Sequence, residues 1–396
     1  MTRLKYGGYA VPHTEWRTHG RVIRYSLLIC SAQKTARQDR TGMEKDYLIL
    51  KRASASRPFA NWNEGVIRAF EHDLRLCQPK ASDEIDEAMT ALAAGADAAS
   101  KGLGKAVKFR DGAIVPALGQ GSWHLAQGRH PEAVEEEALR TGLTLGMTLI
   151  DTAELYGSGL AEEFIGRVIA GQRDRVFLVS KVLPSHVAGD GIARACEASL
   201  TRLGTDYLDL YLLHWRNPDT DLSVVVAAFE NLRLVGKIHA WGVSNFKVSD
   251  MEDLFRVPDG PRCATNQVRY NLNSCGIESD LLPWCEQRGM PVMAYSPLGS
   301  DSLVKDPTLA RIGAAHNCSA TAVALAWTIR SGTVIAIPES GVAAHVKENA
   351  VALSLMLTPQ ELQSLDAAFP MRSTDILRSL LDRSRRWLRS FRNDGM

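Results

Sequence analysis

The chain has 396 residues, 45% of them hydrophobic and 23% charged, a composition typical of a globular protein with room for one barrel or two average domains. The formal net charge is +1, so no overall field attracts nucleic acid or an acidic surface. The seven scattered cysteines form no CxxC pair, which favours a cytoplasmic protein with reduced thiols over a disulfide framework. No run of about 18 apolar residues occurs, so we expect no integral membrane segment.

The first 104 residues differ from the rest of the chain. Residues 1–42 are basic and turn-rich without a sustained period of 2 or 3.6, and Ala91–Gly104 is an Ala- and Gly-rich stretch typical of a linker. We interpret residues 1–104 as a poorly ordered extension. We further hypothesise that much of residues 1–88 lies upstream of the natural start, with Met89 or another internal methionine beginning the working protein, or else that this part is a regulatory extension.

From Lys105 a regular pattern begins. Val107–Arg110 and Ala113–Val115 flank Asp111-Gly112, which predicts a β-hairpin with a type I′ turn. Eight short, largely apolar segments follow and predict strands. They are Ala117–Gln120, Thr148–Ala153, Val176–Val182, Leu208–His214, Ala240–Asn245, Ala264–Arg269, Val292–Ser296 and Val334–Pro338.

Amphipathic segments between these strands predict helices at Pro131–Leu145, Leu160–Ala170, Ile192–Leu203 and Leu222–Val235. Eight strands alternating with helices predict a parallel sheet, either a (β/α)8 barrel or a doubly wound sheet. Gly119-Gln120-Gly121 lacks the third glycine of a dinucleotide fingerprint, which argues against the doubly wound sheet. We therefore predict an α/β protein with a (β/α)8 TIM barrel over residues 105–369 and an N-terminal β-hairpin plug.

Polar residues end several of the predicted strands. Asp151 ends the second strand and Tyr156 follows it, while Lys181 and His214 come after the apolar runs of the third and fourth strands. Each of them alone would be an ordinary capping, surface or structural residue. Because the active sites of barrels lie at the carboxyl ends of their strands, we expect all four at one mouth of the barrel.

These residue types together suit proton transfer. A phenol has a pKa of about 10, and a nearby ammonium lowers that value. We predict that Tyr156 is a general acid, that Lys181 lowers its pKa, that Asp151 anchors Lys181 and that His214 orients a carbonyl oxygen.

Asp151-Thr152-Ala153-x-x-Tyr156-Gly157, Lys181 and His214 resemble the catalytic tetrad of the aldo-keto reductases. The segments GVSN, SPLG and IPES…HVKEN also resemble the cofactor motifs of that family, and WHLAQG, LHW and ATNQVRYNL are similar to a bacterial branch that includes methylglyoxal reductases. The likeness spans roughly 265 residues. It implies an NAD(P)-dependent oxidoreductase that reduces small aldehydes or ketones to alcohols, including 2-oxoaldehydes such as methylglyoxal.

The resemblance implies that several residues hold the cofactor. Gln267 and the GVSN segment would bind the carboxamide, Tyr295 would stack on the nicotinamide, the SPLG segment would hold the pyrophosphate and Ile337–Asn349 would hold the adenosine end. The implied contact residues are Ser244, Asn245, Gln267, Tyr295, Ser296, Leu298, Glu339, Ser340, His345 and Asn349. Trp123 and Trp215 would wall the substrate pocket, or would be core residues.

The sequence departs from the family at the adenosine end. The family commonly has Lys where Glu339 stands and Arg where His345 stands, and both cations bind the 2′-phosphate of NADP. Glu339 would repel that phosphate but accept hydrogen bonds from the ribose of NAD. NADP(H) is the cofactor that the family implies, NAD(H) is the alternative, and Lys347 is a substitute cation.

Other functions fit fewer of the residues. The resemblance leaves room for a catalytically weak cofactor-binding regulatory subunit, and Lys181 could form a Schiff base in a lyase. The histidines show no metal-ligand spacing. We expect a small-molecule carbonyl substrate, no nucleic acid partner and a monomer or weak oligomer. The basic tail, residues 370–396, predicts an amphipathic helix at Ile376–Phe391 that docks on the barrel, or else contacts an anionic membrane or a partner.

Overall fold

The structure is a computed structural model that describes residues 14–18, 21–25, 105–299, 303 and 305–371. The chain divides into two compact units, Met1–Ala60 and Asn61–Met396. In the first unit, β1 (Thr14–Thr18) pairs antiparallel with β2 (Arg21–Tyr25), a strand pair that the sequence analysis did not predict. The expected linker at 91–104, the helix at 376–391 and nearly all of the expected poorly ordered extension lie outside the described residues.

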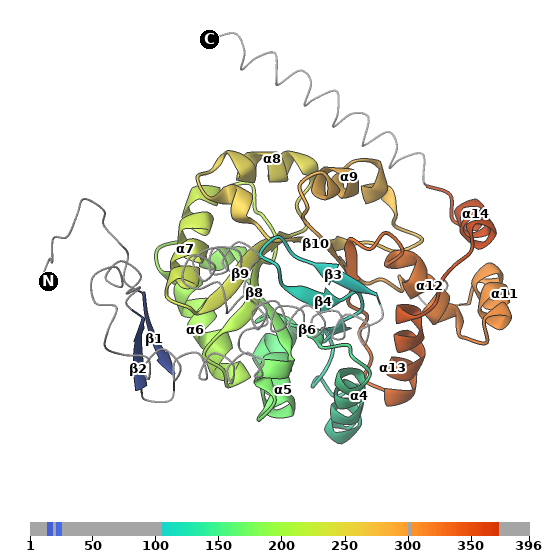
Figure 1. The fold of residues 1–396 in the computed structure, drawn as a ribbon, viewed down its shortest axis with the longest axis horizontal. Helices are drawn as coiled ribbons and strands as arrows, with labels where there is room; N and C mark the ends of the chain where they lie inside the picture. Colours follow the sequence, from blue (N-terminus) through green and yellow to red (C-terminus); the bar gives the residue numbers. More distant parts are fainter. Residues whose placement is uncertain (1–13, 19–20, 26–104, 300–302, 304, 372–396) are drawn as a thin grey trace, which may run out of the picture. The chain divides into compact units, whose positions relative to one another are not determined.

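Eight parallel strands within residues 120–336 form a barrel (Figure 1). Each strand pairs with the next one along the chain, and helices alternate with the strands. The strands are β5 (Gln120–Gly121), β6 (Leu149–Asp151), β7 (Phe177–Val182), β8 (Leu208–Leu213), β9 (Ile238–Ser244), β10 (Asn266–Arg269), β11 (Val292–Tyr295) and β12 (Val334–Ala336). All eight were predicted, and their bounds differ from the predicted ones by up to three residues.

The barrel closes between its first and last strands. Leu118 and Gly121 bridge in parallel to Ala336 and Glu339, and the Gly119 N–H donates to the carbonyl of Ala336 at 2.8 Å. Because every strand then has two neighbours, no edge of the sheet is left exposed within this part of the chain.

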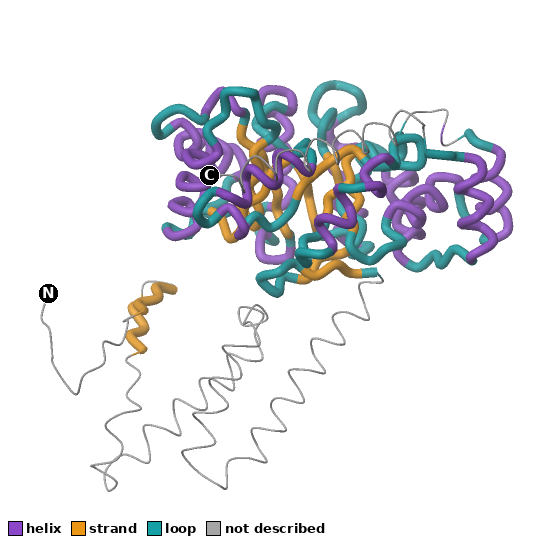
Figure 2. Tube along the Cα trace, turned by 90° about the horizontal axis from the view of Figure 1, so that it is seen from above, coloured by secondary structure: helices purple, strands orange, loops and turns teal. Residues whose placement is uncertain are grey.

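Helices surround the strands (Figures 1 and 2). They are α4 (Glu132–Thr144), α5 (Leu160–Ile169), α6 (Gly191–Leu203), α7 (Leu222–Leu234), α8 (Val248–Arg256), α9 (Leu281–Glu286), α11 (Pro307–Ala315), α12 (Ala320–Thr328), α13 (Ala343–Ala350) and α14 (Pro359–Ala368). The four helices predicted from the sequence are α4 to α7. Their apolar faces and the strands form one buried core, in which the strands are apolar on both faces, as in other covered parallel sheets.

A hairpin crosses the ring of strands, as Figure 1 shows. β3 (Ala106–Lys108) pairs antiparallel with β4 (Ile114–Pro116). Phe109 stacks on Phe177, the first residue of β7, with 5.5 Å between the ring centroids. The hairpin therefore covers the amino-terminal end of the barrel and leaves the carboxyl-terminal end for the site.

The predicted type I′ turn of this hairpin is wrong. A type I′ turn needs positive φ angles at both central residues, but only Gly112 has one, at +97°. The Gly112 N–H donates to the carbonyl of Phe109 at 3.0 Å, so the turn is one residue longer than the predicted two-residue loop.

Candidate active site

Four polar side chains lie where neighbouring strands end. Asp151 is the last residue of β6, Lys181 is the penultimate residue of β7 and His214 directly follows β8. Tyr156 belongs to a 3-10 turn, η2 (Tyr156–Gly159), that follows β6. The structure thus brings these four predicted residues to the carboxyl-terminal mouth of the barrel.

Lys181 is the centre of this cluster and has 0% exposed surface. Its Nζ donates to Asp151 Oδ2 at 2.6 Å, to the Thr152 carbonyl at 2.8 Å and to Tyr156 Oη at 3.1 Å. Gln267 Nε2 donates to the other Asp151 oxygen at 2.7 Å. Both carboxylate oxygens are therefore occupied, and the ammonium is held beside the phenol.

Burial and charge have opposite effects on the pKa values of Lys181 and Asp151. Burial favours the neutral amine of Lys181, but Asp151 and Tyr156 outweigh it and raise its pKa above the ordinary lysine value. Burial likewise raises the pKa of Asp151, against the attraction of Lys181 and the hydrogen bonds from Lys181 and Gln267. A raised lysine pKa keeps the ammonium charged at neutral pH.

The net pKa of Tyr156 differs from the sequence-based expectation. Burial raises the pKa of the phenol above 10.0, and the attraction of Lys181, which lowers it, is the smaller contribution. The direction of the lysine effect agrees with the expectation, but the expected net lowering is wrong because burial penalises the phenolate.

His214 is neutral at physiological pH. Burial and the charge of Lys181 lower the pKa of His214 to about 3. Its ring meets Tyr156 edge-on, with 5.8 Å between centroids and 78° between planes. Nδ1 is buried and has no hydrogen-bond partner among the described residues.

The residues expected to hold a nicotinamide lie around the same mouth. Ser244 Oγ donates to the Gln267 carbonyl at 2.9 Å. Asn245 Nδ2 donates to the carbonyl of His214 at 3.2 Å, and Asn245 Oδ1 accepts from the Tyr295 hydroxyl at 2.9 Å. These side chains join the ends of β8 to β11, where the ring of Tyr295 is half-buried.

Ser296 and Leu298 lie in a turn after β11. The Gly299 N–H donates to the carbonyl of Ser296 at 3.0 Å. The φ angle is positive at both ends of this turn, +47° at Ser296 and +62° at Gly299. Asn271 Nδ2 also donates to the Ser296 carbonyl, at 2.9 Å. Asn271 was not predicted to have a role, although it lies in the segment ATNQVRYNL, which resembles the bacterial branch of the family.

The expected adenosine-end residues lie in the segment before α13 and along that helix. Ser340 Oγ donates to the carbonyl of Val342 at 3.1 Å, Asn349 is 3% exposed and His345 is exposed. The carboxylate of Glu339 instead contacts the loop after β5.

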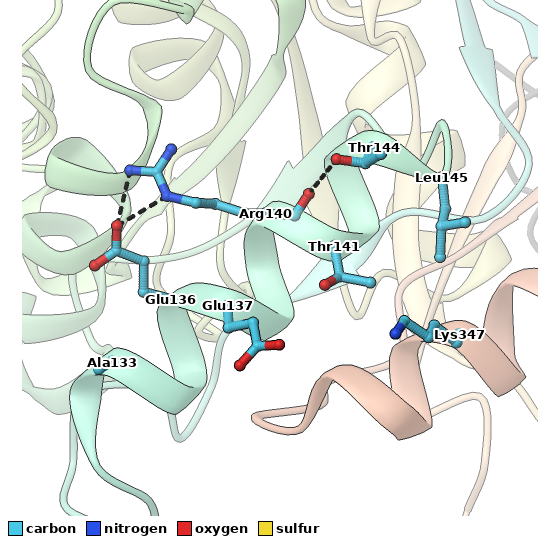
Figure 3. A pocket seen from close by; sticks show the side chains of 8 residues that line it. All are labelled: Ala133, Glu136, Glu137, Arg140, Thr141, Thr144, Leu145 and Lys347. Atoms are coloured by element: carbon cyan, nitrogen blue, oxygen red, sulfur yellow. Dashed lines mark hydrogen bonds and ion pairs between the residues drawn. The ribbon is translucent and has the colours of Figure 1, made fainter.

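Lys347 does not join these residues. It lines a surface groove of about 600 Å³ together with Glu137 and Arg140 of α4 and with Leu145, which directly follows that helix. Figure 3 shows its side chain facing that helix across the groove. The groove contains none of the four clustered residues, and the structure does not support Lys347 as a substitute cation beside Glu339.

The two expected substrate-pocket tryptophans differ in exposure. Trp123 is 57% exposed and stacks on His124, with 4.5 Å between ring centroids. Trp215 is half-buried beside His214, and its Nε1 donates to Asn217 at 3.1 Å.

Within 105–299 and 305–371, no three His, Cys, Asp or Glu side chains gather as metal ligands would, and no helix there has the length and apolar run needed to cross a bilayer. Burial raises the pKa of Cys263 to about 12, so this thiol is a packing residue rather than a nucleophile.

The groups at the mouth fit a nicotinamide. A carboxamide needs both donors and acceptors, and Ser244, Asn245 and Gln267 supply a hydroxyl and two amides at the end of β9 and within β10. Gln267 Nε2 donates to Asp151, and an amide oxygen such as Gln267 Oε1 can accept an amide N–H. The ring of Tyr295 adds a flat apolar face.

Fold and site together define a barrel enzyme, because (β/α)8 enzymes carry their active sites at this end of the strands. The chain belongs to the aldo/keto reductase family, whose model matches residues 117–369.

Three relatives support this assignment. Methylglyoxal reductase YeaE of Escherichia coli (strain K12) is 49% identical over 271 residues, which are 67% of this chain and 95% of that protein. A crystal structure of an aldo/keto reductase from Klebsiella pneumoniae, in complex with NADP and acetate, is 48% identical with a TM-score of 0.65 and covers 68% of this chain and 96% of its own. Glyoxal reductase of Bacillus subtilis (strain 168) is 32% identical over 267 residues, which are 66% of this chain and 91% of that protein.

Proposed function

We propose that this enzyme uses NADPH to reduce small aldehydes and ketones, including 2-oxoaldehydes such as methylglyoxal, and that Tyr156 is the general acid. The Klebsiella relative binds NADP, and the Escherichia coli relative is a methylglyoxal reductase. The observation that carries the proposal is the 3.1 Å contact between the buried Lys181 ammonium and the Tyr156 hydroxyl.

A bound reduced nicotinamide supplies the hydride that reduces the carbonyl carbon. Tyr156 donates its proton to the carbonyl oxygen as negative charge develops there. Lys181 stabilises the phenolate that remains, and Asp151 keeps the ammonium in place. Because positive charge is fixed in a buried site, it stabilises this charge separation more strongly than it would in water.

His214 has a different role in this proposal. Its pKa of about 3 leaves the ring neutral, so it neither competes with Tyr156 as an acid nor adds a second positive charge. A neutral imidazole protonated on Nε2 donates one hydrogen bond, which orients the carbonyl oxygen toward the phenol.

The remaining predicted residues supply binding. Ser244, Asn245, Gln267 and Tyr295 would hold and stack the nicotinamide, with Ser296, Leu298, Ser340, His345 and Asn349 along the rest of the cofactor. Trp123 and Trp215 would flank the carbonyl compound. NADP(H) is the proposed cofactor, and NAD(H) stays the alternative because Glu339 replaces the lysine usual in the family.

The test is a steady-state assay of the wild-type enzyme. We expect methylglyoxal and other small aldehydes to cause oxidation of NADPH, followed as the loss of its absorbance, with NADH measured in parallel. Binding of NADPH without any carbonyl-dependent oxidation across an aldehyde and ketone panel would contradict the proposal.

A further inference from the structure

The carboxylate of Glu339 faces the loop between β5 and α4. Glu339 follows β12 and bridges to Gly121 at the end of β5. Its Oε2 accepts the backbone N–H of His124 at 2.9 Å and its Oε1 accepts from Arg129 Nη1 at 3.1 Å. The His124 ring adds a contact through Nδ1 at 3.1 Å. The side chain of Glu339 is only 17% exposed, so these charge-assisted contacts are partly shielded from water.

A second carboxylate holds the other side of this loop. Glu135 of α4 is 1% exposed, and its Oε2 accepts the backbone N–H of Ala126 at 2.7 Å. Ala126 has a φ of +60°, a conformation that a residue with a side chain adopts at a cost and keeps when its surroundings impose it. The two carboxylates therefore fix the loop at His124 and at Ala126.

The loop that they fix borders the catalytic tyrosine. The side chain of Gln127 packs on Gly157, next to Tyr156, so closely that a Cβ at Gly157 would lie 3.0 Å from Gln127 Cγ. Trp123 stacks on the ring of His124, the residue that Glu339 holds. Displacing His124 would therefore move the exposed Trp123 and also disturb the contact between Gln127 and Gly157.

We propose that Glu339 is a positioning residue for the carbonyl substrate: it fixes the loop that carries Trp123 as one wall of the pocket beside Tyr156, instead of contacting the ribose of the cofactor. Three nitrogen atoms of the loop already contact its two oxygens, so most of the roughly four acceptor positions of the carboxylate are occupied. This inference rests on the proposed reductase function, and it assigns a role to the residue that departs from the family.

The experiment compares Glu339→Ala, Arg129→Ala and the double variant in the complete chain. KM and kcat are measured with methylglyoxal and saturating NADPH, and Kd for NADPH and for NADH is measured by fluorescence titration. We expect Glu339→Ala to raise the carbonyl KM about tenfold, as for the loss of one charge-assisted hydrogen bond. The two Kd values should change by the same small factor.

Arg129→Ala should raise the carbonyl KM less, and the double variant should resemble Glu339→Ala, because coupled residues are not additive. The matched control is Arg140→Ala, which removes an exposed ion pair with Glu136 on α4 and should leave every constant unchanged.

Two results would overturn the inference. One is an unchanged carbonyl KM in both Glu339→Ala and Arg129→Ala. The other is a Kd for NADPH that falls strongly in Glu339→Ala while the Kd for NADH does not, which would identify Glu339 as a cofactor residue. Failure of the underlying function would look different, because the wild-type enzyme itself would then oxidise no NADPH.

Discussion

The ammonium of Lys181 has three oxygen acceptors and no exposed surface. Water therefore screens its charge little, and the charge acts strongly on the phenol beside it. The same contacts argue against the alternative of a Schiff-base lyase, because a nucleophilic lysine needs a lowered pKa and that of Lys181 is raised.

The pKa values of Tyr156 and His214, the two titratable groups proposed to contact the carbonyl, predict that kcat changes little with pH. The pKa of Tyr156 is raised above 10.0 and that of His214 is lowered to about 3. Tyr156 would lose its proton only as the pH rises above its raised pKa, and His214 would gain one only as the pH falls toward 3. We therefore expect kcat, with cofactor and carbonyl saturating, to stay level from about pH 6 to pH 9.

Measuring kcat across this pH range checks the prediction. A kinetic isotope effect with a deuterated cofactor first shows that the chemical step limits kcat. A limb with a midpoint near pH 7 that disappears in His214→Gln would contradict the prediction, since His214 would then titrate far from the value that its burial imposes.

At the scale of the elements, the strands could be predicted from the sequence because they depend on the pattern of apolar residues. All eight strands were found because each is a short apolar run, and the polar residues at their ends stood out for the same reason. Asp151, Lys181 and His214 could thus be predicted to meet once the barrel was predicted.

The remaining features depend on partners distant in sequence. Glu339 was assigned to the cofactor by its position in a motif, but its direction depends on His124 and Arg129, more than 200 residues earlier. Glu135 is an acidic residue in the first turn of α4, but it is buried and accepts the backbone N–H of Ala126. The net pKa of Tyr156 depends on burial, which no local pattern gives.

Helix packing gives a testable prediction at this scale. A Cβ on Gly166 of α5 would lie 2.7 Å from the carbonyl oxygen of Leu203 and 2.8 Å from that of Arg202. Backbone atoms of α6 cannot yield as a side chain would, so we expect Gly166→Ala to lower the free energy of unfolding by about 1–3 kcal/mol. Urea denaturation measures this change.

The control is Glu163→Ala, at an exposed position of the same helix, which should change the free energy of unfolding by less than about 0.5 kcal/mol. Equal stability of Gly166→Ala and the wild-type chain would show that α5 and α6 are farther apart than described.

For the whole molecule, we propose that one barrel carries the entire activity. The family match covers residues 117–369, and the YeaE relative is matched over 95% of its own length by 67% of this chain. All residues proposed for catalysis and cofactor binding lie between Trp123 and Asn349.

A chain beginning at Met89 should therefore keep the kcat and KM of the full chain. The variant retains the hairpin β3–β4, whose Phe109 and Val107 are buried against the barrel, so it should also keep the same thermal midpoint. A large loss of kcat at an unchanged thermal midpoint would instead assign a regulatory role to the first 88 residues.

The central claim is that Tyr156, held beside the buried charge of Lys181, gives its proton to the carbonyl oxygen. The most direct test is kcat of Tyr156→Phe, measured together with the Kd for NADPH. Removing one hydroxyl should lower kcat by on the order of 10²–10⁴, as for the loss of a general acid, and leave the Kd nearly unchanged. A kcat close to that of the wild-type enzyme would contradict the claim.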